Sequence, residues 1–233
     1  HASIPRLAKT MRLSLVIPTL DEERWLPECL TRALEIADEV CVSDGGSRDA
    51  TVEIARSLGV PVVNGMLGRG AQLNRGARST SCEALAFLHA DTRLPPNAAE
   101  LIQQALDGGA LGGGFLLRFE PAQGALRHAH RLTTLRTRLS GWPLGDQMQF
   151  VRRDVFEALG GFREWPILED IDFIRRLRRR GQVAIIDQPV TTSARRFERH
   201  GVLRTSATNY LIWLLYFAGV PPSKLARLYR NIR

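Results

Sequence analysis

Two side chains that can bind a metal ion follow a short apolar run near the middle of the chain. Residues 85–88 read LAFL, as in a buried strand, and His89, Asp91 and Thr92 come directly afterwards. Because ligands of open α/β sheets bind beyond the carboxyl ends of the strands, His89 and Asp91 are expected to point into a crevice. Imidazole and carboxylate groups suit Mn²⁺ or Mg²⁺ holding a diphosphate. Alternatively, Asp91 or Thr92 opens the helix that residues 95–97 (PPN) announce.

Acidic side chains also follow two earlier strands and begin a later helix. The loop after residues 14–18 (SLVIP) carries Glu22, and the strand predicted at 39–43 is followed by Asp44. Asp44 also suits a turn-stabilising role ahead of two glycines. Glu169 and Asp170 open a helix that becomes rich in arginine, so the helix dipole alone explains this acidic pair as well.

The elements that must position these side chains alternate between strand and helix. Strands are predicted at 14–18, 39–43, 60–63 and from residue 84, with helical patterns between them. Such alternation predicts right-handed crossovers, a mainly parallel central sheet flanked by helices and hence an α/β nucleotide-binding fold. The half after Asp91 breaks this rhythm with dense glycine and a basic helical pattern.

Composition limits the partners and the compartment. The 233 residues, 44% of them hydrophobic, suit one domain, and the net charge of +8 favours nucleic acid, acidic lipid or nucleotide phosphates. Cys29, Cys41 and Cys82 lack metal-ligand spacing and indicate buried thiols in a reducing, cytoplasmic compartment. Residues 1–10 lack the apolar core of a signal peptide and are interpreted as an expression remnant or a disordered lead.

The segment 209–220 (NYLIWLLYFAGV) is apolar but too short to span a bilayer. One interpretation is a helix that closes the core or forms half of a homodimer interface. The other is an interfacial helix, with Tyr210, Trp213 and Tyr216 at the headgroup level and the following basic residues on anionic lipid. The second interpretation predicts peripheral membrane contact and a lipid-linked acceptor.

Five segments in order resemble the inverting nucleotide-sugar glycosyltransferases of family 2, which share the GT-A fold. They are SLVIPTLDEE, VSDGGSRDAT, GRGAQLNRGA, LHADT and ILEDIDFIRRL. The resemblance implies a GT-A domain over 11–200 and a helical tail over 201–233 that packs on the domain, a dimer partner or a membrane surface. The segments GRGAQLNRGA, GDQMQF and LGGF are most similar to the small radical-SAM/selenodomain-associated transferases.

The resemblance also implies roles for individual residues. Asp91 corresponds to the last acid of the family's Asp-x-Asp metal motif, with Ala90 between it and His89, which replaces the first acid and should weaken Mg²⁺ binding. Asp170 corresponds to the general base that removes the acceptor's proton, and Glu169 would orient the loop or contact the acceptor. The remaining implied ligand contacts are as follows: Pro18, Thr19 and Glu22 beside the base and ribose, Asp44 on uracil, Arg69, Gln72 and Asn74 along the crevice, Asp146 and Gln147 on acceptor or sugar, and Arg195 and Arg196 on the diphosphate. Arg195 and Arg196 suit a solvated surface equally well.

Two other functions compete with a metal-dependent UDP-sugar transferase. A sugar-1-phosphate nucleotidyltransferase would begin with a glycine-rich loop, whereas PTLDEE is acidic and lacks glycine. A basic nucleic-acid-binding module would explain the charge, but no fold signature of that class is present, so nucleic acid is not expected as a partner.

Overall fold

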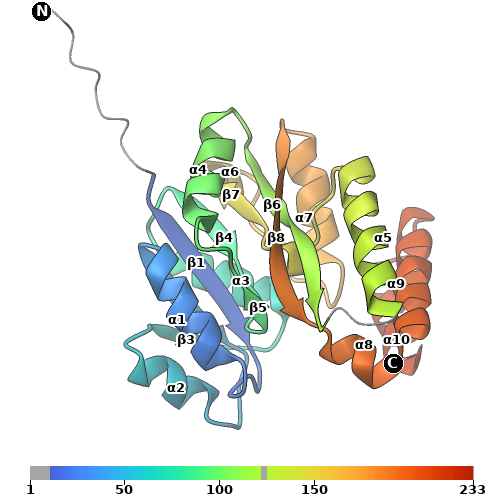
Figure 1. The fold of residues 1–233 in the computed structure, drawn as a ribbon, viewed down its shortest axis with the longest axis horizontal. Coiled ribbons are helices and arrows are strands. Elements are labelled where there is room, and N and C mark those ends of the chain that lie inside the picture. Colours follow the sequence, from blue (N-terminus) through green and yellow to red (C-terminus); the bar gives the residue numbers. More distant parts are fainter. Residues whose placement is uncertain (1–10, 122–124, 233) are drawn as a thin grey trace, which may run out of the picture.

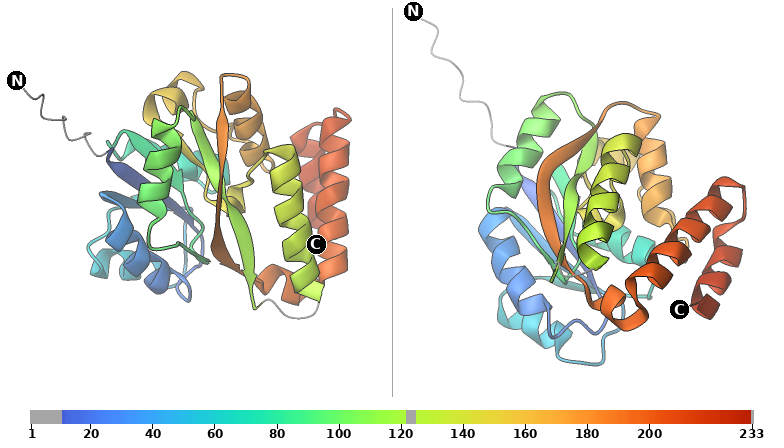
Figure 2. Two further views of the ribbon diagram at one scale, coloured as in Figure 1. Left: turned by 45° about the horizontal axis from the view of Figure 1, so that its top comes forward. Right: turned by 45° about the vertical axis from the view of Figure 1, so that its right-hand side comes forward.

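The computed structural model describes residues 11–121 and 125–232, so the lead predicted at 1–10 lies outside the described residues. An eight-stranded sheet with the order β3-β2-β1-β4-β7-β6-β8-β5 forms the centre of the molecule (Figure 1). Helices cover both of its faces, as the two further views show (Figure 2). The predicted α/β class with a mostly parallel sheet is confirmed.

The first half of the chain forms the parallel part of the sheet. Its strands are β1 (Leu13–Thr19), β2 (Glu39–Asp44), β3 (Val62–Asn64) and β4 (Ala84–Phe87), and its helices are α1 (Leu26–Ile36), α2 (Thr51–Ser57) and α3 (Arg69–Arg78). Alternate residues of β1 face opposite layers, because Leu15 and Ile17 pack toward α1 whereas Val16 packs toward Leu73 of α3. α3 lies close to the sheet at Gly76, where a Cβ atom would overlap with the side chain of Val16.

The second half interrupts the parallel order. Its strands are β5 (Thr92–Arg93), β6 (Gly112–Glu120), β7 (Phe150–Arg152) and β8 (Val183–Ser193). β7 inserts antiparallel between β4 and β6, whereas β6 and β8 run parallel over most of their length. The connecting helices are α4 (Ala98–Asp107), α5 (Ala125–Ser140), η1 (Gly145–Gln147), α6 (Arg153–Ala158) and α7 (Glu169–Arg178).

The helix-capping alternative for Asp91 and Thr92 is excluded by the position of α4. That helix begins at Ala98 and has Asn97 before it, whereas Thr92 belongs to β5 and pairs with Thr192 of β8. The three cysteines are buried and free, as predicted.

The C-terminal helices are α8 (Arg195–His200), α9 (Val202–Phe217) and α10 (Pro222–Ile232). α9 packs beside α5 and α10 along one edge of the molecule (Figures 1 and 2). Trp213 and Phe217 of α9 lie in an aromatic cluster with Trp142, whose ring centroid is 5.5 Å from that of Phe217. Among the described residues, no helix is long and apolar enough to cross a membrane.

Candidate active site

Asp44 lies at the carboxyl end of β2, beside the end of β1. Its carboxylate accepts hydrogen bonds from Thr19 Oγ1 at 3.0 Å, Ser47 Oγ at 2.5 Å, and the backbone N–H groups of Gly46 and Ser47 at 2.8 and 2.9 Å. Burial opposes ionisation of Asp44, but these hydrogen bonds outweigh it and lower its pKa. Asp44 therefore stabilises the turn, as one of the two interpretations predicted, and a nucleotide base must displace one of its partners to bind here.

The two amides of α3 are bonded to backbone groups rather than directed toward a ligand. Gln72 Nε2 donates to the carbonyls of Thr19 and Ser43 at 2.8 and 2.9 Å, which ties the ends of β1 and β2 together. Asn74 exchanges two hydrogen bonds of 2.8 Å with the backbone of Phe162. The polar atoms of both amides have partners within the protein, so the predicted contact with the donor, which stays a prediction, would require one of these hydrogen bonds to be exchanged.

Arg69 connects the end of β4 with the beginning of α7. Its Nη2 lies 2.6 Å from His89 Nε2, and its Nη1 lies 3.2 Å from Glu169 Oε1. A guanidinium only donates hydrogen bonds, so His89 Nε2 is the acceptor and cannot bind a metal in this arrangement. Gly145 leaves the room for Arg69, because a Cβ atom there would overlap with its guanidinium.

Arg195 bridges Asp91 and Glu22. Its Nε lies 2.9 Å from Asp91 Oδ2, and its two terminal nitrogens bind the Glu22 carboxylate at 2.8 and 2.6 Å. Thr192 Oγ1 makes a longer hydrogen bond of 3.4 Å to Asp91. The structure thus brings Glu22 to Arg195, a pairing for which the sequence had no signal. The side chain of Arg196 lies outside the described residues.

Glu169 and Asp170 occupy the first turn of α7, where Glu169 contacts Arg69. Asp170 accepts hydrogen bonds from the backbone N–H groups of Gly145 at 2.7 Å and Ile171 at 2.8 Å. Glu169 is 3% exposed. Burial raises the pKa of Glu169 to about 6, which Arg69 opposes and the neighbouring Asp170 carboxylate reinforces.

Three non-glycine residues with positive φ lie in the loops that carry these side chains. They are Asp21 with φ 53° after β1, Met148 with φ 47° after η1, and Leu168 with φ 68° directly before Glu169; no other non-glycine residue in the described ranges has positive φ. Backbone strain of this kind clusters at functional sites. This strain was not predictable from the sequence, because none of the three residue types demands that conformation.

The turn η1 carries Asp146 and Gln147 toward α5. Gln147 is fully buried, and its Oε1 accepts hydrogen bonds from Leu144 N at 2.9 Å and Arg136 Nη2 at 2.8 Å while its Nε2 donates to Phe115 O. Gln147 therefore supports the turn, and its predicted contact with acceptor or sugar stays a prediction that would require one of these hydrogen bonds to be exchanged. Asp146 is half-buried in the same turn.

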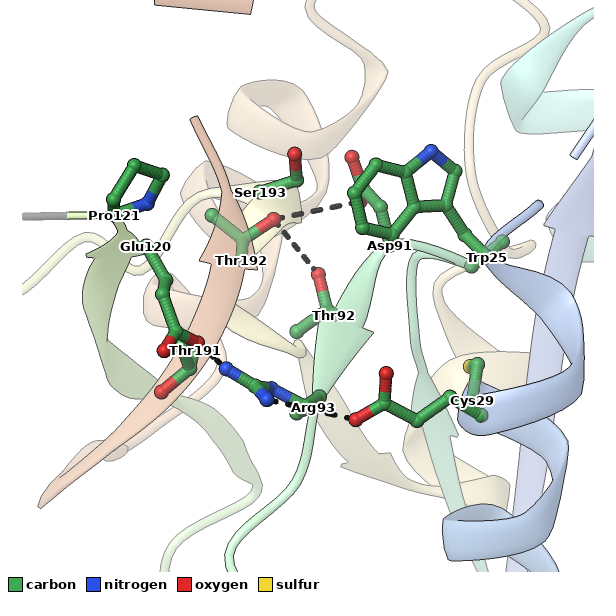
Figure 3. A pocket seen from close by; sticks show the side chains of 12 residues that line it. Trp25, Cys29, Asp91, Thr92, Arg93, Glu120, Pro121, Thr191, Thr192 and Ser193 are labelled. Carbon is green, nitrogen blue, oxygen red and sulfur yellow. Dashed lines mark hydrogen bonds and ion pairs between the residues drawn. The ribbon is translucent and has the colours of Figure 1, made fainter. Parts of the chain in front are cut away.

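A pocket of about 270 Å³ adjoins Asp91 on the side of α1 (Figure 3). Trp25 and Asp91 stand on one side of it, and Thr192 lies between Asp91 and the end of β6. Arg93 crosses the pocket and pairs with Glu28 and Glu120. The volume of the pocket is just below the usual range for small-molecule sites.

The residues at the end of β4 fit a divalent cation that shares its coordination with a diphosphate. Within the described residues there is no group of three or more His, Cys, Asp or Glu side chains that could hold a metal alone. Mg²⁺ sites commonly use one or two carboxylates together with substrate phosphates. The guanidinium on Asp91 also shows that this position attracts positive charge. Asp91 is therefore the principal metal-binding candidate. His89 Nε2 could bind the metal only after Arg69 moves away from it.

Comparisons with known proteins identify the family of the chain and support its fold. The sequence model of glycosyl transferase family 2 matches residues 14–160. Glucosyl-3-phosphoglycerate synthase from Mycobacterium tuberculosis, solved with Mn²⁺, UDP and glucosyl-3-phosphoglycerate, superposes with a TM-score of 0.64 at 22% identity, covering 91% of this chain and 81% of that one. Its complex with Mg²⁺ and UDP gives a TM-score of 0.59, 22% identity and coverages of 78% and 70%.

A curated relative is similar over a shorter stretch. The 4,4'-diaponeurosporenoate glycosyltransferase of Staphylococcus haemolyticus is 33% identical over an alignment of 95 residues, with a coverage of 36% of this chain. The matched stretch spans a quarter of the length of that relative.

Proposed function

The chain belongs to glycosyl transferase family 2 and is a glycosyltransferase, and from this premise we propose that it transfers a sugar from a UDP-linked donor to an acceptor hydroxyl with inversion. The observation that carries this proposal is the position of Arg69. Its guanidinium contacts both His89 at the end of β4 and Glu169 beside Asp170. Arg69 would therefore lie between the diphosphate of the donor, near His89, and the proton-accepting carboxylate of Asp170, next to Glu169.

On the donor side, the ends of β1 and β2 would receive the nucleotide. Pro18, Thr19 and the turn at Asp44 would border the base, and Arg69 and Arg195 offer guanidinium groups for phosphate oxygens. Asp91, with His89, would hold Mn²⁺ or Mg²⁺, which when bound offsets the negative charge that develops on the departing diphosphate. Binding of the metal at Asp91 requires that Arg195 release this carboxylate and keep its bidentate pair with Glu22.

On the acceptor side, Asp170 would act as the general base. Two backbone N–H groups hold its carboxylate, and one of them belongs to Gly145, which lies against the guanidinium of Arg69. Inversion needs such a carboxylate on the face of the sugar opposite the leaving diphosphate, where it takes the proton from the attacking hydroxyl. Glu169 would position Arg69, and Asp146 would face the acceptor or the transferred sugar. We further propose that the acceptor is lipid-linked and that the enzyme makes peripheral membrane contact.

Calorimetry of UDP binding tests the donor assignment. We expect the wild-type protein to bind UDP more tightly with Mn²⁺ than with a chelator, and Asp91→Ala to lose this metal-dependent gain. Asp107→Ala, at the exposed end of α4, is the matched control and should behave like the wild type. Metal-dependent UDP binding that survives in Asp91→Ala would refute the role of Asp91, and failure of the wild type to bind UDP would refute the donor.

A further inference from the structure

The positive charge of the chain is concentrated in two stretches without acidic residues. Residues 121–145 contain four Arg, residues 199–233 contain six Lys and Arg, and neither stretch contains Asp or Glu. The whole chain has a net charge of only +8, so the remaining residues are slightly acidic in sum. The two stretches form α5, α9 and α10, which pack side by side (Figure 2).

The same helices expose large apolar side chains. On α5, Leu132, Leu135 and Leu139 are 58%, 54% and 79% exposed, and their spacing places them on one face of the helix. Arg127 and Arg131 are exposed beside them. A leucine ridge bordered by arginines is typical of a helix that lies in a membrane interface.

A second apolar stripe follows α9. Leu203, Tyr210, Leu214 and Phe217 are all more than half exposed and recur at intervals of seven, four and three residues, so they share one face. We call the exposed apolar residues of α5 and α9 the leucine face.

We propose that the leucine face docks on a bilayer that contains anionic lipid. The apolar side chains would enter the boundary between headgroups and acyl chains, and the surrounding Lys and Arg residues would meet the anionic headgroups. A second copy of this chain is the less suitable partner, because docking two such faces would bring like charges together. Nucleic acid would use the charge but leave the exposed leucines in water.

The structure changes which side chains would contact lipid. Of the three aromatic residues that the sequence indicated, only Tyr210 is more than half exposed. Trp213 stacks on the Arg136 guanidinium at 5.1 Å, and Tyr216 packs against Trp165 and Phe217. The leucines of α5, which lie in the basic helical pattern and were not predicted to contact lipid, take their place.

The docking helix also reaches the candidate active site. Arg136 on the inner side of α5 donates a hydrogen bond of 2.8 Å to Gln147, in the turn that carries Asp146 and Gly145, the partner of Asp170. A membrane-held acceptor would thus approach from the side of the proposed base. The approach of an acceptor to the base rests on the proposed function, whereas the docking on lipid is argued only from the exposed leucines and arginines of these helices.

Vesicle co-sedimentation of the full chain tests the docking proposal. We expect binding to vesicles of phosphatidylcholine with phosphatidylglycerol, little binding to phosphatidylcholine alone, and weaker binding as salt increases. The triple variant Leu132→Ser, Leu135→Ser, Leu139→Ser should lose about tenfold or more in affinity. Its control is Leu34→Ser with Leu58→Ser, two exposed leucines outside the leucine face.

A second pair of variants tests the charge and does not alter the leucines. Arg127→Glu with Arg131→Glu should weaken vesicle binding about tenfold or more, whereas Arg56→Glu with Arg78→Glu makes the same change of net charge elsewhere and should matter less. Equal effects of both pairs, or no binding by the wild type, would overturn the proposal. A dimer in sedimentation velocity that the leucine variant abolishes would also overturn the proposal. So would binding of the protein to RNA without binding to vesicles that contain anionic lipid.

Discussion

Replacing Glu169 with Gln should stabilise the protein at neutral pH and leave its stability unchanged in acid. Glu169 is almost fully buried, and its pKa in the fold is about 6 against an ordinary value of 4.5. The folded state therefore binds this proton more tightly than the unfolded state does. The stabilisation from the protonated group is fully present below about pH 4.5 and is lost as the pH rises through about 6.

The size of the effect follows from the shift. A difference of about 1.5 pKa units corresponds to about 2 kcal/mol of unfolding free energy. Gln resembles the protonated acid in shape and carries no charge, so Glu169→Gln avoids this cost at every pH. For a domain of this length, the melting temperature above pH 7 should rise by about 4–8 °C.

Urea unfolding between pH 4 and 8, without nucleotide, measures this difference. Glu157→Gln is the matched control, because Glu157 is exposed on α6 and has no burial cost to relieve. The reasoning fails if Glu169→Gln is no more stable than the wild type at pH 8, or if its advantage is the same at pH 4. A confirmed result would mean that the fold tolerates a destabilising carboxylate beside Asp170, as expected where function opposes stability.

Two further predictions concern the division of roles. Asp170→Asn should lose about 10²-fold to 10⁴-fold in turnover while UDP binding persists. Asp44→Ala should lose UDP affinity in calorimetry. Loss of UDP binding in Asp170→Asn together with normal binding in Asp44→Ala would show that both roles are assigned wrongly. Gly145→Ala should displace Arg69 from His89 and Glu169 and lower kcat/KM about tenfold to a hundredfold in a donor-hydrolysis assay, whereas Gly108→Ala should not; wild-type activity in Gly145→Ala would show that the position of Arg69 is unimportant.

The parallel half of the fold was predictable because its strands are buried on both sides. β1 and β4 are largely apolar, β2 has the apolar centre Val40–Val42, and helical patterns of ordinary length separate them, so the predicted alternation is observed. β7 was not predictable in the same way. It has three residues, Phe150–Arg152, and its antiparallel pairing between β4 and β6 depends on contacts between segments more than 35 residues apart.

The strand-end acids were found from sequence because the topology of a parallel sheet gathers them at one edge. No comparable rule predicts which side chains these acids and the nearby amides will pair with. Nothing local distinguishes an amide that binds a ligand from one that binds a backbone carbonyl, so the backbone partners of Gln72 and Asn74 were not predictable. Glu22 and Arg195 are 173 residues apart, and only the folded chain brings them together.

Two arginines, Arg69 and Arg195, explain how the candidate active site accommodates its carboxylates. Arg69 pairs with the carboxylate of Glu169, and Arg195 pairs with the carboxylates of Glu22 and Asp91. Without these arginines the carboxylates would lack compensating positive charge. Such a cluster is costly without compensating cations. Under the proposed function, an incoming diphosphate and its metal would bring charges of both signs, so Asp91 would exchange its guanidinium for the metal while the freed donors would meet phosphate. Arginine at these positions would then stabilise the site before nucleotide binds, in a form that binding could rearrange without leaving a buried charge unpaired.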